Sequence, residues 1–130
     1  MHRLSVILVV RNEEAQIRQC LETVVWASEI IVVDQGSQDG TCRIAREFTD
    51  KVFVVEPKGY CEPDRIFALS KASGAWVLCL DADERIPRGL TVEIQEKIKD
   101  DTGEYDGYYL KRNNYIFGRL MQYGGHQGDR

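Results

Sequence analysis

Hydrophobic residues recur along the chain in short continuous runs, and longer segments with helical spacing separate these runs. Four of the runs are rich in β-branched and other apolar residues: Leu4–Val10, Ile30–Val33, Lys51–Val55 and Trp76–Leu80. Such continuous runs are typical of strands that are buried on both faces. Between them, apolar residues recur with the period of an amphipathic helix. Strands that alternate with helices predict an α/β fold, with a mostly parallel sheet and helices on both faces.

The helical segments have recognisable ends. Asn12 is a candidate cap for a first helix, with Glu13 and Glu14 in its first turn and apolar residues at 17, 20, 21, 24 and 25. Three further helices are expected over Thr41–Phe48, Glu62–Ser73 and Gly89–Lys99. Beyond Asp100 the sequence is rich in tyrosine, which predicts two short β segments around a turn at Phe117-Gly118-Arg119.

Polar residues follow three of the predicted strands directly. Arg11-Asn12-Glu13 comes after the first strand, Asp34 after the second, and Asp81-Ala82-Asp83 after the fourth. In a parallel sheet the carboxyl ends of the strands share one edge, and ligands bind outside that edge. The convergence of these residues therefore predicts a binding site.

Carboxylates at a strand end favour a hard divalent cation such as Mg²⁺ or Mn²⁺, which takes carboxylate oxygens together with phosphate oxygens. Asp83 is the expected metal ligand, and Asp81 is expected to act through water or a ribose contact. Asp34 would accept hydrogen bonds from a base or ribose, and the backbone of Val10, Arg11 and Asn12 would wrap the base. Three basic residues would offset the remaining charge of a nucleoside diphosphate: Arg11, Lys58 and Arg65. For each residue alone, the alternative is a solvated surface group.

Composition narrows the possible classes of protein further. The 130 residues are 43% apolar, enough for the core of one domain over residues 1–130. The net charge of −4 and isoelectric point near 5.2 exclude a nucleic-acid-binding stripe. The four cysteines have no paired spacing, which predicts buried reduced thiols instead of a zinc site. With no membrane-spanning apolar run and no signal-peptide pattern, we expect a cytoplasmic protein.

Three motifs together resemble a known family. Their residues read V-I-L-V-V-R-N-E-E at 6–14, I-V-V-D-Q-G-S-Q-D-G-T at 31–41 and W-V-L-C-L-D-A-D-E at 76–84. In this order and spacing they resemble the donor-binding half of family 2 glycosyltransferases, which have a GT-A fold. The segments 20–24, 64–69 and 111–118 are similar to the lipopolysaccharide-core β-glucosyltransferase-like branch of that family.

The resemblance implies metal-dependent transfer of a sugar from a UDP-sugar or GDP-sugar to an acceptor hydroxyl, with inversion. Carried over by motif, Asp34 would contact the nucleoside, Asp81 the ribose or sugar, Asp83 the metal, and Arg65 the diphosphate or donor sugar, with Glu13 and Ala82 beside them. It implies a donor-binding core over about residues 1–100 and the start of an acceptor region over about 101–130. The acceptor would be a glycan or lipid-linked molecule.

The chain departs from the branch at two places. It has Asp64-Arg65-Ile66 where the branch tends to have Gln-Arg-Asn, and Gly124-Gly125-His126 where a tryptophan follows two glycines. Family members also continue beyond the position of Arg130 into an acceptor-binding half, which normally carries the catalytic base. The local carboxylates Glu104, Asp106 and Asp129 do not identify that base, and neither does His126.

A second hypothesis is a nucleotide-sugar-binding domain without transferase activity, completed by a partner subunit. A nucleotidyltransferase is disfavoured because Arg11-Asn12-Glu13-Glu14, and not a glycine-rich phosphate loop, follows the first strand. A receiver-like domain would need a lysine near the last strand as well as an acidic pair after the first, and it gives the D-Q-G-S-Q-D-G-T turn at 34–41 no role, so it is disfavoured. The tyrosine-rich tail leaves a homodimer interface and a peripheral membrane contact open, beside a hairpin packed on the domain edge.

Overall fold

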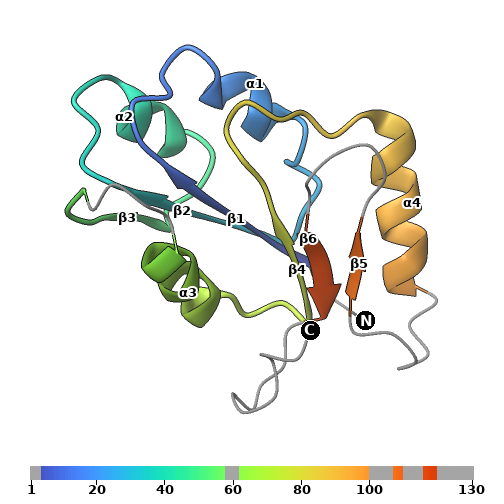
Figure 1. The fold of residues 1–130 in the computed structure, drawn as a ribbon. Helices are drawn as coiled ribbons and strands as arrows, with labels where there is room; N and C mark the ends of the chain where they lie inside the picture. Colours follow the sequence, from blue (N-terminus) through green and yellow to red (C-terminus); the bar gives the residue numbers. More distant parts are fainter. Residues whose placement is uncertain (1–3, 58–61, 100–106, 110–115, 120–130) are drawn as a thin grey trace.

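The computed structural model describes residues 4–57, 62–99, 107–109 and 116–119. Its strands form one sheet in the order β3-β2-β1-β4-β6-β5 (Figure 1). The strands span β1 Leu4–Val10, β2 Glu29–Asp34, β3 Val52–Val54, β4 Trp76–Cys79, β5 Gly107–Tyr109 and β6 Ile116–Arg119. The pairs of β1 with β2, β2 with β3 and β1 with β4 are parallel, whereas β4 pairs with β6 in the antiparallel sense. The predicted α/β fold with a mostly parallel sheet is confirmed.

Helices cover both faces of this sheet. The helices are α1 Ile17–Glu22, α2 Thr41–Ala45, α3 Glu62–Lys71 and α4 Arg88–Lys99. Alternate residues of β1 point to opposite faces: Val6 and Leu8 pack with residues of α1, α2 and α4, while Ile7 packs with Ala68 of α3. None of the described helices is both long and apolar enough to cross a membrane.

The core explains why these strands form where they do. Trp76, Ile31 and Leu78 have no exposed surface. Fully burying a large apolar side chain contributes roughly 1.5–3 kcal/mol. Continuous apolar strands can be covered on both sides only in the interior of a layered sheet, and β1, β2 and β4 are all interior strands.

Three expectations about element ends were wrong. The first helix begins at Ile17 after Gln16, and Asn12 lies upstream with a positive φ of 53°. The helix starts late because the Asn12 side chain bonds the loop after β2 instead of capping a helix. Val25 is 60% exposed because α1 ends before it. Phe117-Gly118-Arg119 lies within β6 and is not a turn, because these residues pair with β4.

Candidate functional site

The carboxyl ends of β1, β2 and β4 bring the sequence-predicted polar residues to one edge of the sheet. Val10 and Asp34 are partners in the register of β1 and β2, and the N–H of Gln35 donates to the carbonyl of Val10 at 2.9 Å. The N–H of Leu80 donates to the carbonyl of Ile7 at 3.0 Å. The loops that follow β1 and β4 both pass over the top of the view in Figure 1. The fold therefore places these residues at the edge where ligands bind in parallel sheets.

The loops after β1 and β2 are joined by reciprocal hydrogen bonds. The N–H of Asn12 donates to Ser37 Oγ at 2.7 Å, and Asn12 Oδ1 accepts from the N–H of Gln38 at 2.8 Å. The N–H of Glu13 donates to Thr41 Oγ1 at 2.8 Å. These contacts use backbone donors of one loop and side-chain acceptors of the other, so the two loops hold each other in one conformation.

Asp34 is an internal support of this arrangement. Its side chain is 1% exposed. Its Oδ2 accepts from the N–H of Ser37 at 3.0 Å, and its Oδ1 accepts from the hydroxyl of Ser37. Both oxygens are therefore engaged by Ser37, and each keeps one further acceptor site.

The acidic turn after β4 is anchored to α1. The N–H of Asp81 donates to Glu84 Oε1 at 2.8 Å, and the N–H of Glu84 donates to the Asp81 carbonyl at 2.9 Å. The Cys20 thiol donates to the same carbonyl at 3.5 Å. Arg85 donates to Gln19 Oε1 at 3.0 Å. With their backbone fixed in this way, the Asp81 and Asp83 side chains are exposed, whereas Ala82 is buried at 3% exposure.

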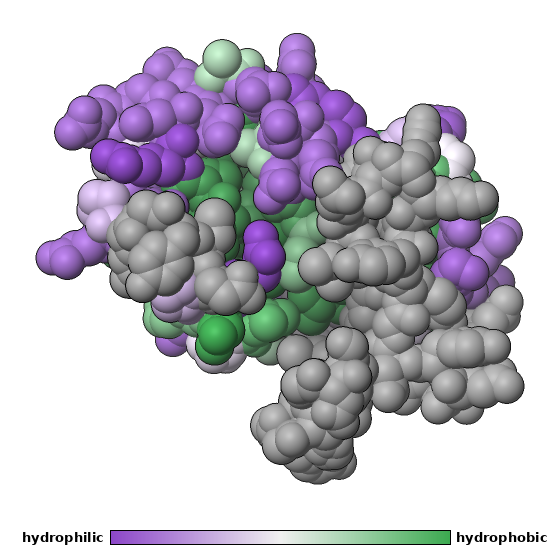
Figure 2. Space-filling model, viewed as in Figure 1, coloured by the Kyte–Doolittle hydropathy of each residue, from purple (hydrophilic) through white to green (hydrophobic). Residues whose placement is uncertain are grey.

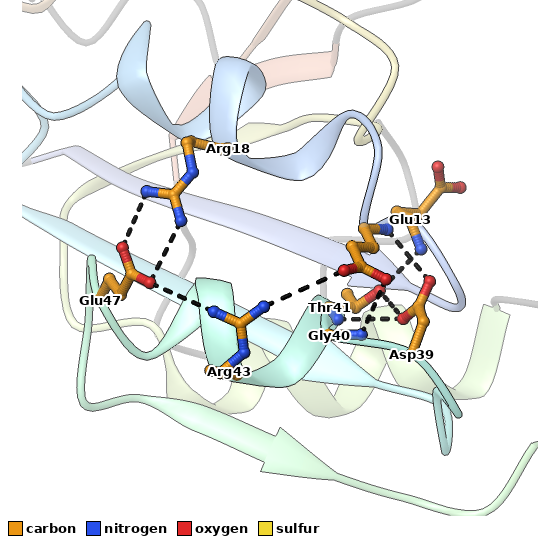
Figure 3. A network of polar contacts seen from close by, with 8 residues as sticks. Glu13, Arg18, Asp39, Gly40, Thr41, Arg43 and Glu47 are labelled. Atoms are coloured by element: carbon orange, nitrogen blue, oxygen red, sulfur yellow. Dashed lines mark hydrogen bonds and ion pairs between the residues drawn. The ribbon is translucent and has the colours of Figure 1, made fainter.

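Negative charge gathers at this edge. Partial burial, followed by the charges of Asp83 and Asp81, raises the pKa of Glu13 above its usual value. Burial and the same two aspartates raise the pKa of Glu84, against the hydrogen bond from the Asp81 N–H. Figure 3 shows the carboxyl group of Glu13 pointing away from the network of Arg18, Glu47 and Arg43. Glu13 of the first loop is therefore close enough to the acidic turn to be repelled by it.

The donor set fits a Mg²⁺ or Mn²⁺ ion that is shared with a bound phosphate. Within the described ranges, no three or more His, Cys, Asp or Glu side chains are grouped so as to hold a metal ion by themselves. Mg²⁺ commonly takes one or two protein carboxylates and completes its shell with phosphate and water. The exposed Asp81 and Asp83 match that pattern, and an ion would reduce the repulsion felt by Glu13.

The remaining predicted residues differ in exposure, and some of them lie outside the described residues. Arg65 lies in the first part of α3 and is half-buried, and Arg11 is exposed after β1. Val10 is 2% exposed, so only its backbone could face a ligand. Lys58 lies outside the described residues, as do Cys61, Glu104, Asp106, His126 and Asp129. Cys20 is buried and Cys42 and Cys79 are half-buried, all three as free thiols.

Two features of the site were not anticipated from the sequence. Gln35 donates to Asp64 Oδ2 at 2.7 Å, and both side chains are buried. Glu84 and Arg85 fix the acidic turn. A polar residue directly after a buried strand was a visible signal for Gln35, but its partner lies 29 residues away.

The surface around the site is polar. Hydrophilic residues spread across the upper part of the view in Figure 2, where α1, α2 and the loops before them lie in Figure 1. On this surface Arg18 forms a paired hydrogen bond with Glu47, and Arg43 lies between Glu47 and Glu14 (Figure 3). These exposed ion pairs connect α1 to α2 and contribute little stability individually.

The fold matches those of solved sugar-transferring enzymes. A mannosyltransferase from Pyrobaculum calidifontis, in complex with GDP-Man and Mn²⁺, superposes with a TM-score of 0.75 at 19% identity, over 91% of this chain and 44% of that one. Glucosyl-3-phosphoglycerate synthase from Mycobacterium tuberculosis, in complex with Mg²⁺ and UDP, superposes with a TM-score of 0.65 at 25% identity, over 80% of this chain and 42% of that one. The parallel sheet with its acidic strand end is therefore of the GT-A class.

The family follows from sequence comparison. The family model described as "Glycosyl transferase family 2" matches residues 5–124. The lipopolysaccharide core biosynthesis glycosyltransferase LpsC of Rhizobium meliloti (strain 1021) is 33% identical over 120 residues, which are 88% of this chain and 44% of that protein. The chain belongs to glycosyltransferase family 2. It spans less than half the length of the curated relatives that it matches.

Proposed function

We propose that this chain is the donor-binding part of a glycosyltransferase that moves a sugar from a nucleotide-diphosphate sugar, a UDP-sugar in the first instance, to an acceptor hydroxyl. The observation that carries the proposal is the convergence of Asp81, Asp83 and Glu13 at the carboxyl edge of the sheet, where partial burial and the charges of the two aspartates raise the pKa of Glu13. A divalent cation with a diphosphate would neutralise this edge.

Each predicted residue has a role in the proposal. Asp83 would hold the Mg²⁺ or Mn²⁺ ion, and Asp81 would contact it through water or bind the ribose. Asp34 would accept from the nucleoside, while the backbone at Val10, Arg11 and Asn12 encloses the base. A bound metal supplies Lewis-acid stabilisation of the departing diphosphate.

The remaining groups orient the donor. Arg65, with Lys58, would offset phosphate charge, and the α1 contacts of the 81–86 turn keep Asp81 and Asp83 in place. The acceptor oxygen would form the new bond to the anomeric carbon on the side opposite the breaking bond to phosphate, which inverts that carbon. The acceptor proton would pass to a general base.

Relatives support the choice of ligands. Solved complexes of the synthase from Mycobacterium tuberculosis at 25% identity contain UDP with Mg²⁺ or Mn²⁺. The name of LpsC, lipopolysaccharide core biosynthesis glycosyltransferase, supports a glycan or lipid-linked acceptor. We further propose residues 1–100 as the donor-binding core and 101–130 as the start of the acceptor region, in a cytoplasmic protein with reduced cysteines. A homodimer, a partner subunit and a peripheral membrane contact stay predictions.

The test is calorimetric titration of the chain with UDP and with GDP, each in Mn²⁺ and again in chelator. We expect UDP to bind in Mn²⁺ and to weaken in chelator. Asp83→Ala should lower the Mn²⁺-dependent affinity by at least about tenfold, because a charged ligand is lost. Asp50→Ala is the matched control, since Asp50 is exposed and precedes β3 at the opposite edge of the sheet.

Two results would contradict the proposal. One is a folded wild-type chain that binds neither nucleotide in Mn²⁺. The other is an Asp83→Ala variant that keeps the full Mn²⁺-dependent affinity, which would remove Asp83 from the metal site while leaving donor binding in place.

A further inference from the structure

A buried hydrogen bond joins the end of β2 to the first turn of α3. Gln35 Nε2 donates to Asp64 Oδ2 at 2.7 Å. Gln35 is 7% exposed and Asp64 is 3% exposed. A buried carboxylate is costly unless it is hydrogen-bonded, so this contact constrains where α3 begins relative to the sheet.

Gln35 is also tied to the strand ends that form the site. Its backbone N–H donates to the Val10 carbonyl at 2.9 Å, and it directly follows Asp34, whose carbonyl accepts from the N–H of Val55 at 2.8 Å. The backbone of Gln35 is therefore fixed between β1 and β3. A group that hydrogen-bonds to the Gln35 side chain is thereby held in a defined position relative to Asp34.

Asp64 connects the position of Gln35 to the inner face of α3. It lies four residues before Ala68, so both side chains share one face of the helix. Ala68 has no exposed surface and packs against Ile7, Ile31 and Val33 on the sheet. The inner face of α3 is thus held at its first turn by a polar contact and one turn later by apolar packing.

Arg65 directly follows Asp64 and is half-buried. Successive residues of a helix are rotated by about 100°, so fixing the Asp64 face also fixes the direction in which Arg65 leaves the helix. Because α3 follows a parallel strand, its first turn lies at the carboxyl edge of the sheet. Arg65 therefore starts at the edge that carries Asp34 and the acidic turn.

We propose that the Gln35–Asp64 hydrogen bond is the positioning contact that sets Arg65 against the diphosphate of the donor. The inference rests on the proposed function, since it needs a diphosphate at this edge. Gln35 and Asp64 act through Arg65 and are positioning residues. In this chain Asp64 stands where the resembling branch tends to have Gln, so the pair supplies one donor and one acceptor.

The test measures Mn²⁺-dependent UDP affinity by calorimetry, at a temperature where circular dichroism shows each variant folded. Asp64→Ala removes the acceptor and should weaken UDP binding by about tenfold, because a charge-assisted contact no longer orients Arg65. Asp64→Asn keeps an acceptor oxygen and should stay within about threefold of the wild type. Uridine, which has no phosphate, should bind Asp64→Ala as it binds the wild type.

A reversed pair gives a sharper test. Gln35→Glu places two buried carboxylates face to face and should also weaken UDP binding by about tenfold. Adding Asp64→Gln restores a donor and an acceptor with exchanged roles, and should return the affinity to within about threefold of the wild type. Gln95→Glu is the matched control, because it makes the same change at an exposed position of α4, beside Leu4 and Ser28 at the amino edge of the sheet.

A double-mutant cycle with Arg65→Met tests whether the loss of UDP affinity in Asp64→Ala acts through Arg65. If the contact works through Arg65, Asp64→Ala should cause no further loss of UDP affinity once Arg65→Met is present. An equal loss in both backgrounds, or a reversed pair that stays weak, would overturn the inference. Full UDP affinity in folded Asp64→Ala would overturn it while leaving the proposed function intact. A wild-type chain that binds neither UDP nor GDP in Mn²⁺ would refute both.

Discussion

Burial raises the pKa of two side chains beside the acidic turn, Glu13 and Cys20, but leaves them with different roles. Glu13 is half-buried and carries a raised pKa from burial and from Asp83 and Asp81. Cys20 has no exposed surface, and its thiol donates to the Asp81 carbonyl. Burial, opposed by Arg85 and assisted by the nearby carboxylates, raises the pKa of Cys20 to about 12. The carboxylate remains available to a cation, whereas the thiol is a structural donor.

We therefore predict that Cys20 is protected from alkylation in the folded protein. At pH 8 almost none of its thiol is ionised, and the thiolate is the reactive form. Iodoacetamide labelling followed by peptide mass spectrometry should leave Cys20 unmodified until denaturant is added. Cys42, which is half-buried on α2, is the internal control and should react faster in the folded state. Rapid native labelling of Cys20 would contradict this account of its environment.

The connection after β2 shows how an element end depends on one backbone conformation. Gly36 has a φ of 69°, a region that residues with a Cβ rarely adopt. A Cβ added there would lie 3.1 Å from Pro57 Cδ in the segment after β3. Gly36 thus allows the β2 loop to turn toward Ser37, where it bonds Asp34 and Asn12.

Gly36→Ala should destabilise the fold by about 1–2 kcal/mol, because both the left-handed conformation and the close approach to Pro57 oppose a side chain. Gly89→Ala is the matched control. Nothing lies within 4 Å of a Cβ at Gly89, in the first turn of α4, and alanine there should stabilise by about 0.5–1 kcal/mol. Urea unfolding monitored by circular dichroism measures both. Equal effects of the two substitutions would contradict the strain at Gly36.

At the level of the whole molecule, one carboxylate connects several segments at the amino edge of the sheet, which lies opposite the site. Glu29 at the start of β2 accepts from Ser5 Oγ of β1 at 2.5 Å and from the N–H of Ser73 at 2.9 Å, and it pairs with Lys51 before β3. Ser5 Oγ also accepts from the N–H of Gly74 at 2.9 Å. Although burial alone would raise it, the pKa of Glu29 is lowered to about 2 by these hydrogen bonds.

The lowered pKa of Glu29 predicts that the free energy of unfolding falls in acid. The pKa of Glu29 is lower in the folded state than its ordinary 4.5, so its contribution is complete above about pH 4.5 and is lost as the pH falls toward 2. The loss should reach about 3 kcal/mol in the free energy of unfolding. Urea unfolding between pH 5 and pH 3 measures the slope, which Glu29→Gln should reduce. Glu22→Gln, an exposed change at the end of α1, should keep the wild-type slope.

The strands, the parallel sheet and the edge that carries the site could be predicted because they depend on local hydrophobic pattern. Four apolar runs alternate with helical segments, and parallel pairing then places the carboxyl ends of these four strands at one edge of the sheet. The acidic turn after β4 was visible for the same reason. The ends of helices were harder to predict from the sequence. Asn12 has the residue type of a helix cap, but its side chain accepts a hydrogen bond from the loop after β2 instead.

What the pattern could not supply is the pairing of polar groups that lie far apart in the sequence. Gln35 with Asp64, and Glu29 with Ser5 and Ser73, each look like ordinary surface residues when read one at a time. Their burial and partners arise when strands and helices from different parts of the chain are packed together, because that packing excludes water and makes each hydrogen bond necessary. Hydrophobic periodicity along the chain was enough to determine the layers and the site edge of this protein; the contacts that hold Asp34 and the acidic turn in place were decided by three-dimensional packing.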